Sequence, residues 1–296
     1  MTTTIAVFTK SRINPAYAAA RLGADRRARE LGAQVVQYVP EKPENVEEQI
    51  AQIDRALAQR HDAFVFVPVH PTAVNAAIRK VVASGVPLVG YLNPFSEPGP
   101  LTQVISDDYT LALKITIFLC ERLERRGSVV VVEGPPHSIT SNDRVRGFRD
   151  ALGRFPQMRI AASICGEYDR DAARAVTAEL IASDVSFDAV IAANDVMALG
   201  AIDALDAGGR KAVVIGVNAI PDAITAIKQG KLLATSDFDA MNMAAIATEA
   251  AIRHLRGETV PKLIGLPVQI VHAKNYMAWD KPFEERTLLD WNSVVK

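Results

Sequence analysis

The chain alternates strand-like and helix-like segments almost without interruption, and this alternation constrains the fold more than any other feature. Short runs rich in Val and Ile are typical of strands that are buried on both faces. We expect such strands at residues 5–9, 34–39, 63–67, 88–91, 129–133, 160–164, 189–192 and 213–217. Helical patterns lie between them, at residues 17–31, 46–59, 72–84, 109–126, 144–155, 171–183, 197–207 and 241–256. Strict alternation of this kind predicts parallel sheets with helices on both faces.

The two halves of the chain open in the same way. Thr9 ends the first strand, and Gly23 follows it inside a helix. Glu133 ends a later strand, and Gly147 follows it at the same separation, again inside a helix. A chain of 296 residues is long enough for two lobes of ordinary domain size. We therefore expect an α/β fold built from two similar Rossmann-like lobes with parallel sheets.

Composition argues against several classes of partner. The formal net charge is −1 and the basic residues are scattered, so no overall field attracts nucleic acid or an anionic membrane. No apolar run reaches the roughly 18–20 residues of a membrane span. The first expected strand begins almost at once after Met1, so we expect no secretory signal within this chain. Cys120 and Cys165 are expected to be small buried apolar residues, which leaves the redox compartment open.

The first polar loop, Lys10–Pro15, follows the first strand, and in α/β folds such loops are where ligands bind. Asn14 is a good helix N-cap, and Pro15 suits the first helical position. One interpretation is that Asn14 only caps the helix. The other is that the loop presents Lys10, Asn14 and Tyr17 to a cleft.

Polar residues also follow strands in the second half. The loop Gly134–Arg144 is expected to face the same way as the first loop, with Arg144 in a structural role. Asn194 and Asn218 each come directly after a buried strand, where Asn194 could also serve simply as a helix cap. Residues 234–239 are expected to cross between the lobes.

Catalytic motifs are absent from the sequence. It contains no G-x-S-x-G elbow, no P-loop and no G-x-G-x-x-G. Its five histidines show no metal-ligand spacing. We therefore expect a protein that is not an enzyme and that uses no cofactor and no metal.

Several of these segments, taken in order, resemble one family. They are Lys10–Gly23 with its Asn-Pro-x-Tyr, Ile105–Asp108, Arg144–Phe148, Asn194–Gly200 and Ile220–Leu232. Together they resemble the periplasmic sugar-binding proteins of the ribose-binding type, the solute receptors of ABC importers. The resemblance covers roughly residues 4–272.

The resemblance implies the type I periplasmic binding protein fold, in which a ligand is held between two lobes joined by a three-segment hinge. The crossings fall near Ser106-Asp107, Ser236-Asp237 and Leu263–Leu266. The implied N-terminal lobe is residues 1–105 with 238–264, and the C-terminal lobe is residues 106–237 with 265–296. The tail from residue 273 onward, with Trp279, Phe283 and Trp291, is expected to cover a lobe or the hinge.

The loops and the resemblance together give a set of candidate ligand contacts. They are Lys10, Asn14, Tyr17, Tyr91, Asn93, Asn142, Tyr168, Asn194, Asn218, Asp237 and Phe238, with Tyr17 and Tyr168 as aromatic walls. Where the family carries charged side chains, this sequence has Leu92, Asn93, Asn142 and Asn218. A side-chain amide both donates and accepts, as a hydroxylated ligand requires. The resemblance with these departures therefore implies a neutral ligand, either a monosaccharide or, more specifically, an acyclic sugar alcohol.

The resemblance also implies a periplasmic monomer that delivers its ligand to the permease of an ABC importer and meets the membrane only through that complex. Two other classes stay open. The effector-binding domain of a lac-repressor-type regulator shares this fold, but it would need a DNA-binding helix pair ahead of Ile5. An enzyme on a doubly wound fold would reveal itself by turnover of a sugar or nucleotide.

Overall fold

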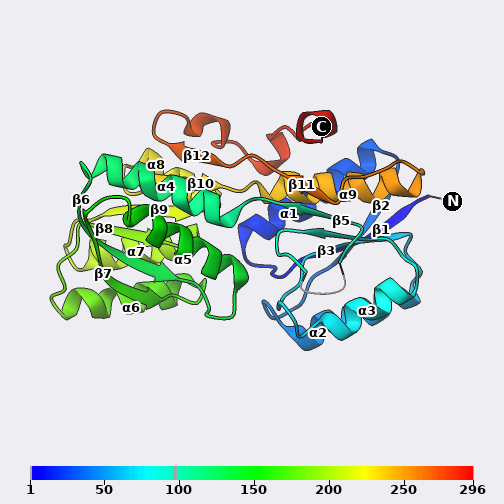
Figure 1. The fold of residues 1–296 in the computed structure, drawn as a ribbon, viewed down its shortest axis with the longest axis horizontal. Helices are drawn as coiled ribbons and strands as arrows, with labels where there is room; N and C mark the ends of the chain where they lie inside the picture. The colour runs from blue at the N-terminus through cyan, green and yellow to red at the C-terminus, as the bar shows by residue number, and fades with distance from the viewer. Residues whose placement is uncertain (1, 96–98, 296) are drawn as a thin grey trace. The chain divides into compact units, whose positions relative to one another are not determined.

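The computed structural model describes residues 2–95 and 99–295, and its contacts divide the chain into two units (Figure 1). Unit 1 comprises Met1–Ser106, Asp239–Leu266 and Phe283–Lys296. Unit 2 comprises Asp107–Phe238 and Pro267–Pro282. The chain therefore passes from one unit to the other after Ser106, Phe238, Leu266 and Pro282, one crossing more than the resemblance implied.

The sheet of unit 1 has six strands, all parallel, in the order β11-β5-β4-β3-β1-β2. Its strands are β1 (Thr4–Phe8), β2 (Gln34–Tyr38), β3 (Ala63–Phe66), β4 (Leu88–Tyr91), β5 (Thr102–Ile105) and β11 (Leu263–Gly265). Its helices are α1 (Pro15–Glu30), α2 (Val46–Ala58), α3 (Asn75–Ala83), α9 (Ala240–Leu255) and α10 (Trp291–Val294), with the 3₁₀ turn η2 (Phe283–Glu285).

Helices cover both faces of the unit 1 sheet, as expected for strands that are apolar on both sides. On one face, α2 and α3 pack Ile53 and Ile78 against Phe8, Phe64 and Phe66 of the strands. On the other face, α1 and α9 lie side by side, and α9 packs against β3, β4 and β5. The sheet is thus the middle layer of three.

The sheet of unit 2 also has six strands, in the order β12-β10-β9-β8-β6-β7. Its strands are β6 (Arg126–Glu133), β7 (Gln157–Cys165), β8 (Ala189–Ala192), β9 (Val213–Val217), β10 (Ala234–Asp237) and β12 (Gln269–His272). All pairs are parallel except β10 with β12. Its helices are α4 (Asp108–Arg122), α5 (Ile139–Leu152), α6 (Arg170–Ala182), α7 (Asp195–Ala207) and α8 (Pro221–Lys228), with the 3₁₀ turn η1 (Tyr276–Ala278).

The two sheets repeat one strand order, which confirms the expected pair of Rossmann-like lobes. Strands β1 to β4 correspond in position to β6 to β9, and all of these strands were predicted. Strands β5, β10, β11 and β12 and helix α8 were not predicted as elements. These strands have three or four residues each and lie at or next to a crossing between units, so their sequences show little periodicity.

The two glycines that mark the internal repeat lie at equivalent helix contacts. Gly23 of α1 faces the backbone of Met241 on α9, where an added Cβ would come within 2.1 Å of a carbonyl oxygen. Gly147 of α5 faces the backbone of Tyr109 on α4, where an added Cβ would come within 2.5 Å of the Tyr109 carbonyl oxygen. Only a residue without a side chain permits such close approach, so the repeat records two close helix pairs, α1 with α9 and α4 with α5.

The C-terminal tail corrects one expected boundary. We placed all of residues 265–296 in the C-terminal lobe, but Phe283–Lys296 belongs to unit 1. The reason is a set of polar anchors on α1 and α9. Arg27 donates to the Leu289 carbonyl at 2.6 Å, and the Leu289 amide donates to Asn242 at 2.7 Å. Trp291 is buried beside the guanidinium of Arg253, whose carbon lies 4.8 Å from the ring centre.

Candidate functional site

Three candidate ligand residues lie at one edge of the unit 2 sheet. Asn194 follows β8, Asn218 follows β9 and Asp237 ends β10. These strands are parallel, so their carboxyl ends meet at the same edge, which is where open α/β sheets bind ligands. The structure therefore brings together side chains that lie far apart in the sequence.

Asn194 has the capping role that the sequence suggested. Its Oδ1 accepts from the backbone amide of Met197 at 2.8 Å, at the start of α7. The side chain is buried, with 2% of the residue exposed. Within residues 2–95 and 99–295 we find no hydrogen bond from its Nδ2, so the cap leaves the side-chain NH2 group for another partner.

Asn218 is held in an unusual backbone conformation by a buried carboxylate. Asn218 and Ala219 have φ angles of 127° and 52°, in the region that disfavours residues with side chains. Asp195 accepts from the Ile220 amide at 3.1 Å and from the Thr235 hydroxyl at 2.6 Å. Burial raises the pKa of Asp195 to about 6, against the hydrogen bonds from Thr235 and Ile220 that lower it. These contacts fix the loop that carries Asn218.

Arg144 lies among the candidate residues of unit 2. Its Nε donates to Asp108 Oδ1 at 2.7 Å, and its Nη1 donates to the Ala193 carbonyl at 2.7 Å. The same Nη1 lies 3.5 Å from Asn218 Oδ1, and the guanidinium carbon lies 5.4 Å from the ring centre of Phe238. Arg144 thus links the ends of β8, β9 and β10.

The sequence contained a signal for this arrangement that we used only in part. Arg144 precedes Gly147 by three residues and Phe148 by four, so it lies on the buried face of α5. A buried arginine requires partners, and the expected structural role is the one it has. What sequence reasoning missed is that its partners include two of the ligand candidates, Asn218 and Phe238. Burial raises the pKa of Asp108, although the Arg144 charge lowers it.

Asp237 and Phe238 lie at the carboxyl end of β10. Both are largely buried, with 9% and 6% of each residue exposed. The indole Nε1 of Trp279, from the C-terminal segment, donates to Asp237 Oδ2 at 2.6 Å. This contact brings a residue of the tail to the candidate site.

Tyr168 and Asn142 both contact the loop that follows β6. The Tyr168 ring lies against Gly134, where a Cβ would come within 2.5 Å of Cζ, and its hydroxyl lies 3.2 Å from Thr140 Oγ1. Asn142 is exposed on the first turn of α5, and its Nδ2 donates to the Pro136 carbonyl at 3.1 Å. Both side chains therefore stabilise this loop, and no contact between them and Asn194, Asn218 or Asp237 is found among the described residues.

In unit 1, the loop between β1 and α1 has the predicted cap. Asn14 is the N-cap of α1 with Pro15 inside the first turn, and its Oδ1 accepts from the Ala16 amide at 3.0 Å. The hydroxyl of Ser11 accepts from the Asn14 amide at 3.2 Å. Arg21 donates to the Ser11 carbonyl at 3.0 Å. The loop is thus well fixed, with Tyr17 half-buried one turn into the helix.

Lys10 is paired within its own unit. Its Nζ lies 3.0 Å from Glu44 Oε1, and 5% of its side chain is exposed. The Glu44 amide also donates to the Lys10 carbonyl at 2.9 Å. An opposite charge at this distance offsets the charge of the ammonium group.

Tyr91 was predicted as a ligand contact, and the structure places its side chain in the core of unit 1. Tyr91 is fully buried, and its hydroxyl donates to the Phe8 carbonyl at 2.8 Å. Burial raises its pKa well above the ordinary value, with a smaller contribution from nearby Tyr17. Tyr91 ends β4, whose side chains are buried on both faces of the sheet, so it belongs to the core. Asn93 lies beyond it, half-buried, with Nδ2 donating to the Pro68 carbonyl at 3.3 Å.

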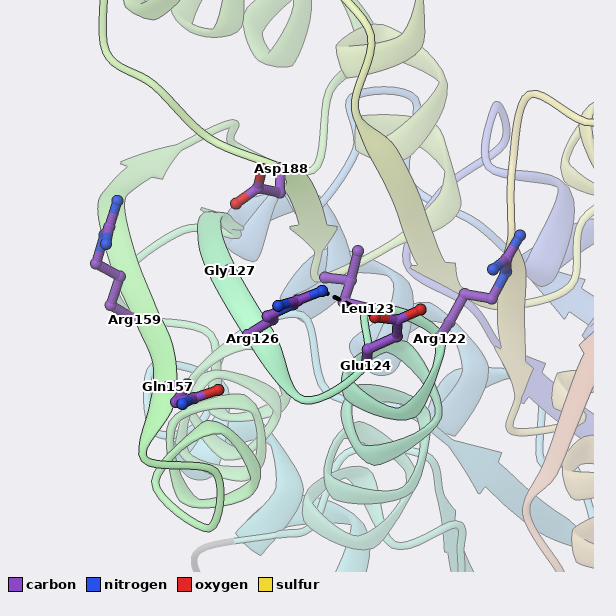
Figure 2. Close-up of a pocket in the computed structure, with 8 residues that line it drawn as sticks. All are labelled: Arg122, Leu123, Glu124, Arg126, Gly127, Gln157, Arg159 and Asp188. Carbon is purple, nitrogen blue, oxygen red and sulfur yellow. Dashed lines mark hydrogen bonds and ion pairs between the residues drawn. The ribbon is translucent and has the colours of Figure 1, made fainter.

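A hollow lies at the opposite edge of the unit 2 sheet (Figure 2). It is lined by the amino ends of β6 and β7 and contains Arg122, Arg126 and Arg159. Figure 2 shows Arg122 and Arg159 on opposite sides of the hollow, and Arg126 pairs with Glu124 at 3.0 Å. These cations do not converge on one point, so we do not assign the ligand site here. In residues 2–95 and 99–295 no cluster of His, Cys, Asp and Glu could hold a metal.

The fold and this strand-end site define the class of protein. Residues 5–259 match the family described as periplasmic binding protein domain, so the chain belongs to that family. The part of the chain described by the structure contains no helix with the length and apolarity to span a membrane.

Two relatives and two solved structures show what the chain is similar to. It is 28% identical to a ribose import binding protein of Bacillus subtilis, over 87% of this chain and 83% of the relative. It is 28% identical to a xylitol-binding protein of Mycolicibacterium smegmatis, over 65% of this chain and 56% of the relative. An ABC transporter solute-binding protein of Actinobacillus succinogenes with bound D-allose aligns with a TM-score of 0.88 and 25% identity, over 92% of this chain and 98% of that one. A Bacillus halodurans protein with bound myo-inositol has the same fold, with a TM-score of 0.87 and 23% identity, over 94% and 97% of the two chains.

Proposed function

We propose that this protein is the solute-binding component of an ABC importer and that it binds a neutral monosaccharide or sugar alcohol. Support comes from the family and from relatives that are named for binding ribose and xylitol. Within the chain, one observation carries the proposal. Asn194, Asn218 and Asp237 meet at the carboxyl edge of one sheet, where a ligand with several hydroxyls finds both donors and acceptors.

The way in which Lys10 and Arg144 are paired supports a neutral ligand. Lys10 forms an ion pair with Glu44, and Arg144 forms one with Asp108. A carboxylate or phosphate ligand would have to compete with these carboxylates for the same cations. A neutral polyol requires only hydrogen bonds, and each buried hydroxyl left unmatched costs about 1–3 kcal/mol.

We also propose that Asn14 and Tyr17 of unit 1 contribute to the same ligand, with Tyr17 and Tyr168 burying its C–H surfaces. The position that holds a charged residue in the ribose-binding type is Asn218 here, and it donates and accepts without charge. An acyclic sugar alcohol has neither a ring oxygen nor an anomeric hydroxyl, so it suits such a site. The protein acts as a monomer in the periplasm, releases its ligand chemically unchanged, and passes it to a membrane permease.

A thermal-shift panel tests the proposal. Tetritols, pentitols, hexitols and aldoses are compared with sugar acids and sugar phosphates at equal concentration. We expect stabilisation by one or more neutral members and the largest effect among the sugar alcohols. The same panel on Asn218→Ala should show that stabilisation sharply reduced. Stabilisation by acids or phosphates alone would refute neutrality, and stabilisation by aldoses alone would refute the acyclic assignment.

A further inference from the structure

The C-terminal segment returns to the candidate site after leaving it. Strand β12 runs antiparallel to β10, pairing Gln269 with Asp237 and His272 with Ala234. Strand β12 therefore runs alongside β10 from the carboxyl end of β10 to its amino end. It then turns back through η1, and Trp279 Nε1 donates to Asp237 Oδ2 at 2.6 Å. This segment lies beyond residue 259, where the family match ends.

The return path is fixed by contacts other than the indole itself. The Trp279 amide donates to the Tyr276 carbonyl at 2.8 Å, which closes the 3₁₀ turn. Asn275 donates from Nδ2 to a carbonyl of β12 at 2.9 Å. Asp280, next to the tryptophan, pairs with Lys228 at the end of α8 at 2.7 Å. The residues before and after Trp279 are thus both fixed, and they hold the indole at Asp237.

We propose that Trp279 is a positioning residue of the ligand site and acts through Asp237. An indole N–H can only donate, and a short bond from it to a carboxylate is of the stronger, charge-assisted kind. Asp237 is 9% exposed, so few other orientations compete once this bond is made. Trp279 therefore fixes the orientation in which the Asp237 carboxylate meets a hydroxyl of the ligand. The inference rests on the proposed function, because it concerns the same site.

A double-mutant cycle tests this role by isothermal titration with xylitol, D-ribose and D-allose as probes. Trp279→Phe keeps an aromatic ring but removes the donor. We expect affinity to fall about 5- to 30-fold, short of the full value of one hydrogen bond to a charged group, because the indole acts on the ligand only through Asp237. Asp237→Asn should weaken binding at least as much. In the Asp237→Asn background, Trp279→Phe should cause a clearly smaller loss, because the bond through which it acts is already weakened.

Two further variants separate positioning from folding. Trp291→Phe makes the same substitution in unit 1 and should leave affinity within twofold of wild type. Asp280→Ala removes the ion pair with Lys228 and keeps the indole. This variant should weaken binding about two- to fivefold. Circular dichroism of each variant should match that of the wild type.

The outcomes distinguish this inference from the proposed function. Binding of at least one probe by the wild type, with coupled losses in the cycle, supports both. Two results would overturn the role of Trp279 and leave the proposed function standing, provided that the wild type binds. One is unchanged affinity in both Trp279→Phe and Asp280→Ala. The other is a double variant in which the fold losses of the two single variants simply multiply. A wild type that binds no neutral sugar or polyol overturns the proposed function, and the inference with it.

Discussion

Nε of Arg144 donates to Oδ1 of Asp108 at 2.7 Å, and this ion pair lies below the surface of unit 2, with 6% and 15% of the two side chains exposed. Removing one partner leaves an uncompensated buried charge, which is strongly destabilising. We expect Arg144→Met to lower the free energy of unfolding by about 3–5 kcal/mol, as measured by denaturant titration. The double variant Arg144→Met/Asp108→Asn should regain part of this loss.

Arg146 provides the matched control on the same helix. Its side chain is 61% exposed and pairs with Asp143 at the surface. Arg146→Met should change the free energy of unfolding by less than about 1 kcal/mol. Equal losses for the two arginine variants would contradict the structural role of the buried pair.

The close helix contacts predict that two glycines cannot be replaced. In Gly23→Ala and Gly147→Ala the new Cβ meets backbone atoms at 2.1 and 2.5 Å, and backbone cannot move aside cheaply. Each variant should lose about 2 kcal/mol or more of stability, with the helix pair displaced. Gly265→Ala is the control, because nothing lies within 4 Å of its added Cβ. A Gly23→Ala protein as stable as Gly265→Ala would show that α1 and α9 are not so closely packed.

The tail of unit 1 should contribute to the stability of that unit. Trp291 is 7% exposed and lies next to Arg253, while Leu289 binds both Arg27 and Asn242. Trp291→Ala should lower the free energy of unfolding by about 2–4 kcal/mol. The exposed Leu263, replaced by alanine, should have an effect below about 0.5 kcal/mol. Faster hydrogen exchange in α1 and α9 of Trp291→Ala would place the loss of stability in unit 1. Faster exchange confined to unit 2 would contradict the stabilising role of the tail in unit 1.

Asp195 should give the stability a pH dependence of definite sign. Its pKa rises on folding, through burial, from 3.8 to about 6, so the folded state binds the proton more tightly than the unfolded chain. The contribution of this group to stability is therefore largest at acid pH, falls as pH rises through that window, and is constant above it. Asp195→Asn should remove up to about 3 kcal/mol of this fall, measured by urea titration across the window. An unchanged pH slope in the variant would show that Asp195 does not titrate there.

The sequence predicted most of the fold because the long elements carry clear patterns. Strands β1 to β4 and β6 to β9 are continuous apolar runs or alternations, and the caps of α1 and α7 follow from Asn14 and Asn194. The short strands at the crossings carry too few residues for such a pattern. The boundary at Pro282 depends on contacts with Leu289 and Trp291 that sequence spacing does not reveal.

The candidate site was predicted in outline but not in its internal bonds. Strand ends can be read from sequence, so Asn194 and Asn218 were expected at the ends of β8 and β9. Asp237 was a candidate only through the resemblance, because β10 itself was not predicted. Tyr91 also ends a strand, but whether its hydroxyl meets a ligand or the Phe8 carbonyl depends on tertiary packing. The contacts of Arg144 and Trp279 with the strand ends join segments that are distant in sequence, and no local pattern indicates them.

The central claim, that a neutral polyol binds at the carboxyl edge of the unit 2 sheet, is tested most directly by difference electron density. Crystals would be grown with whichever pentitol or aldose stabilises the protein most. We predict density for the ligand within hydrogen-bonding distance of Asn194, Asn218 and Asp237. Density at the opposite edge of that sheet instead, in the hollow lined by Arg126 and Arg159, would contradict the account.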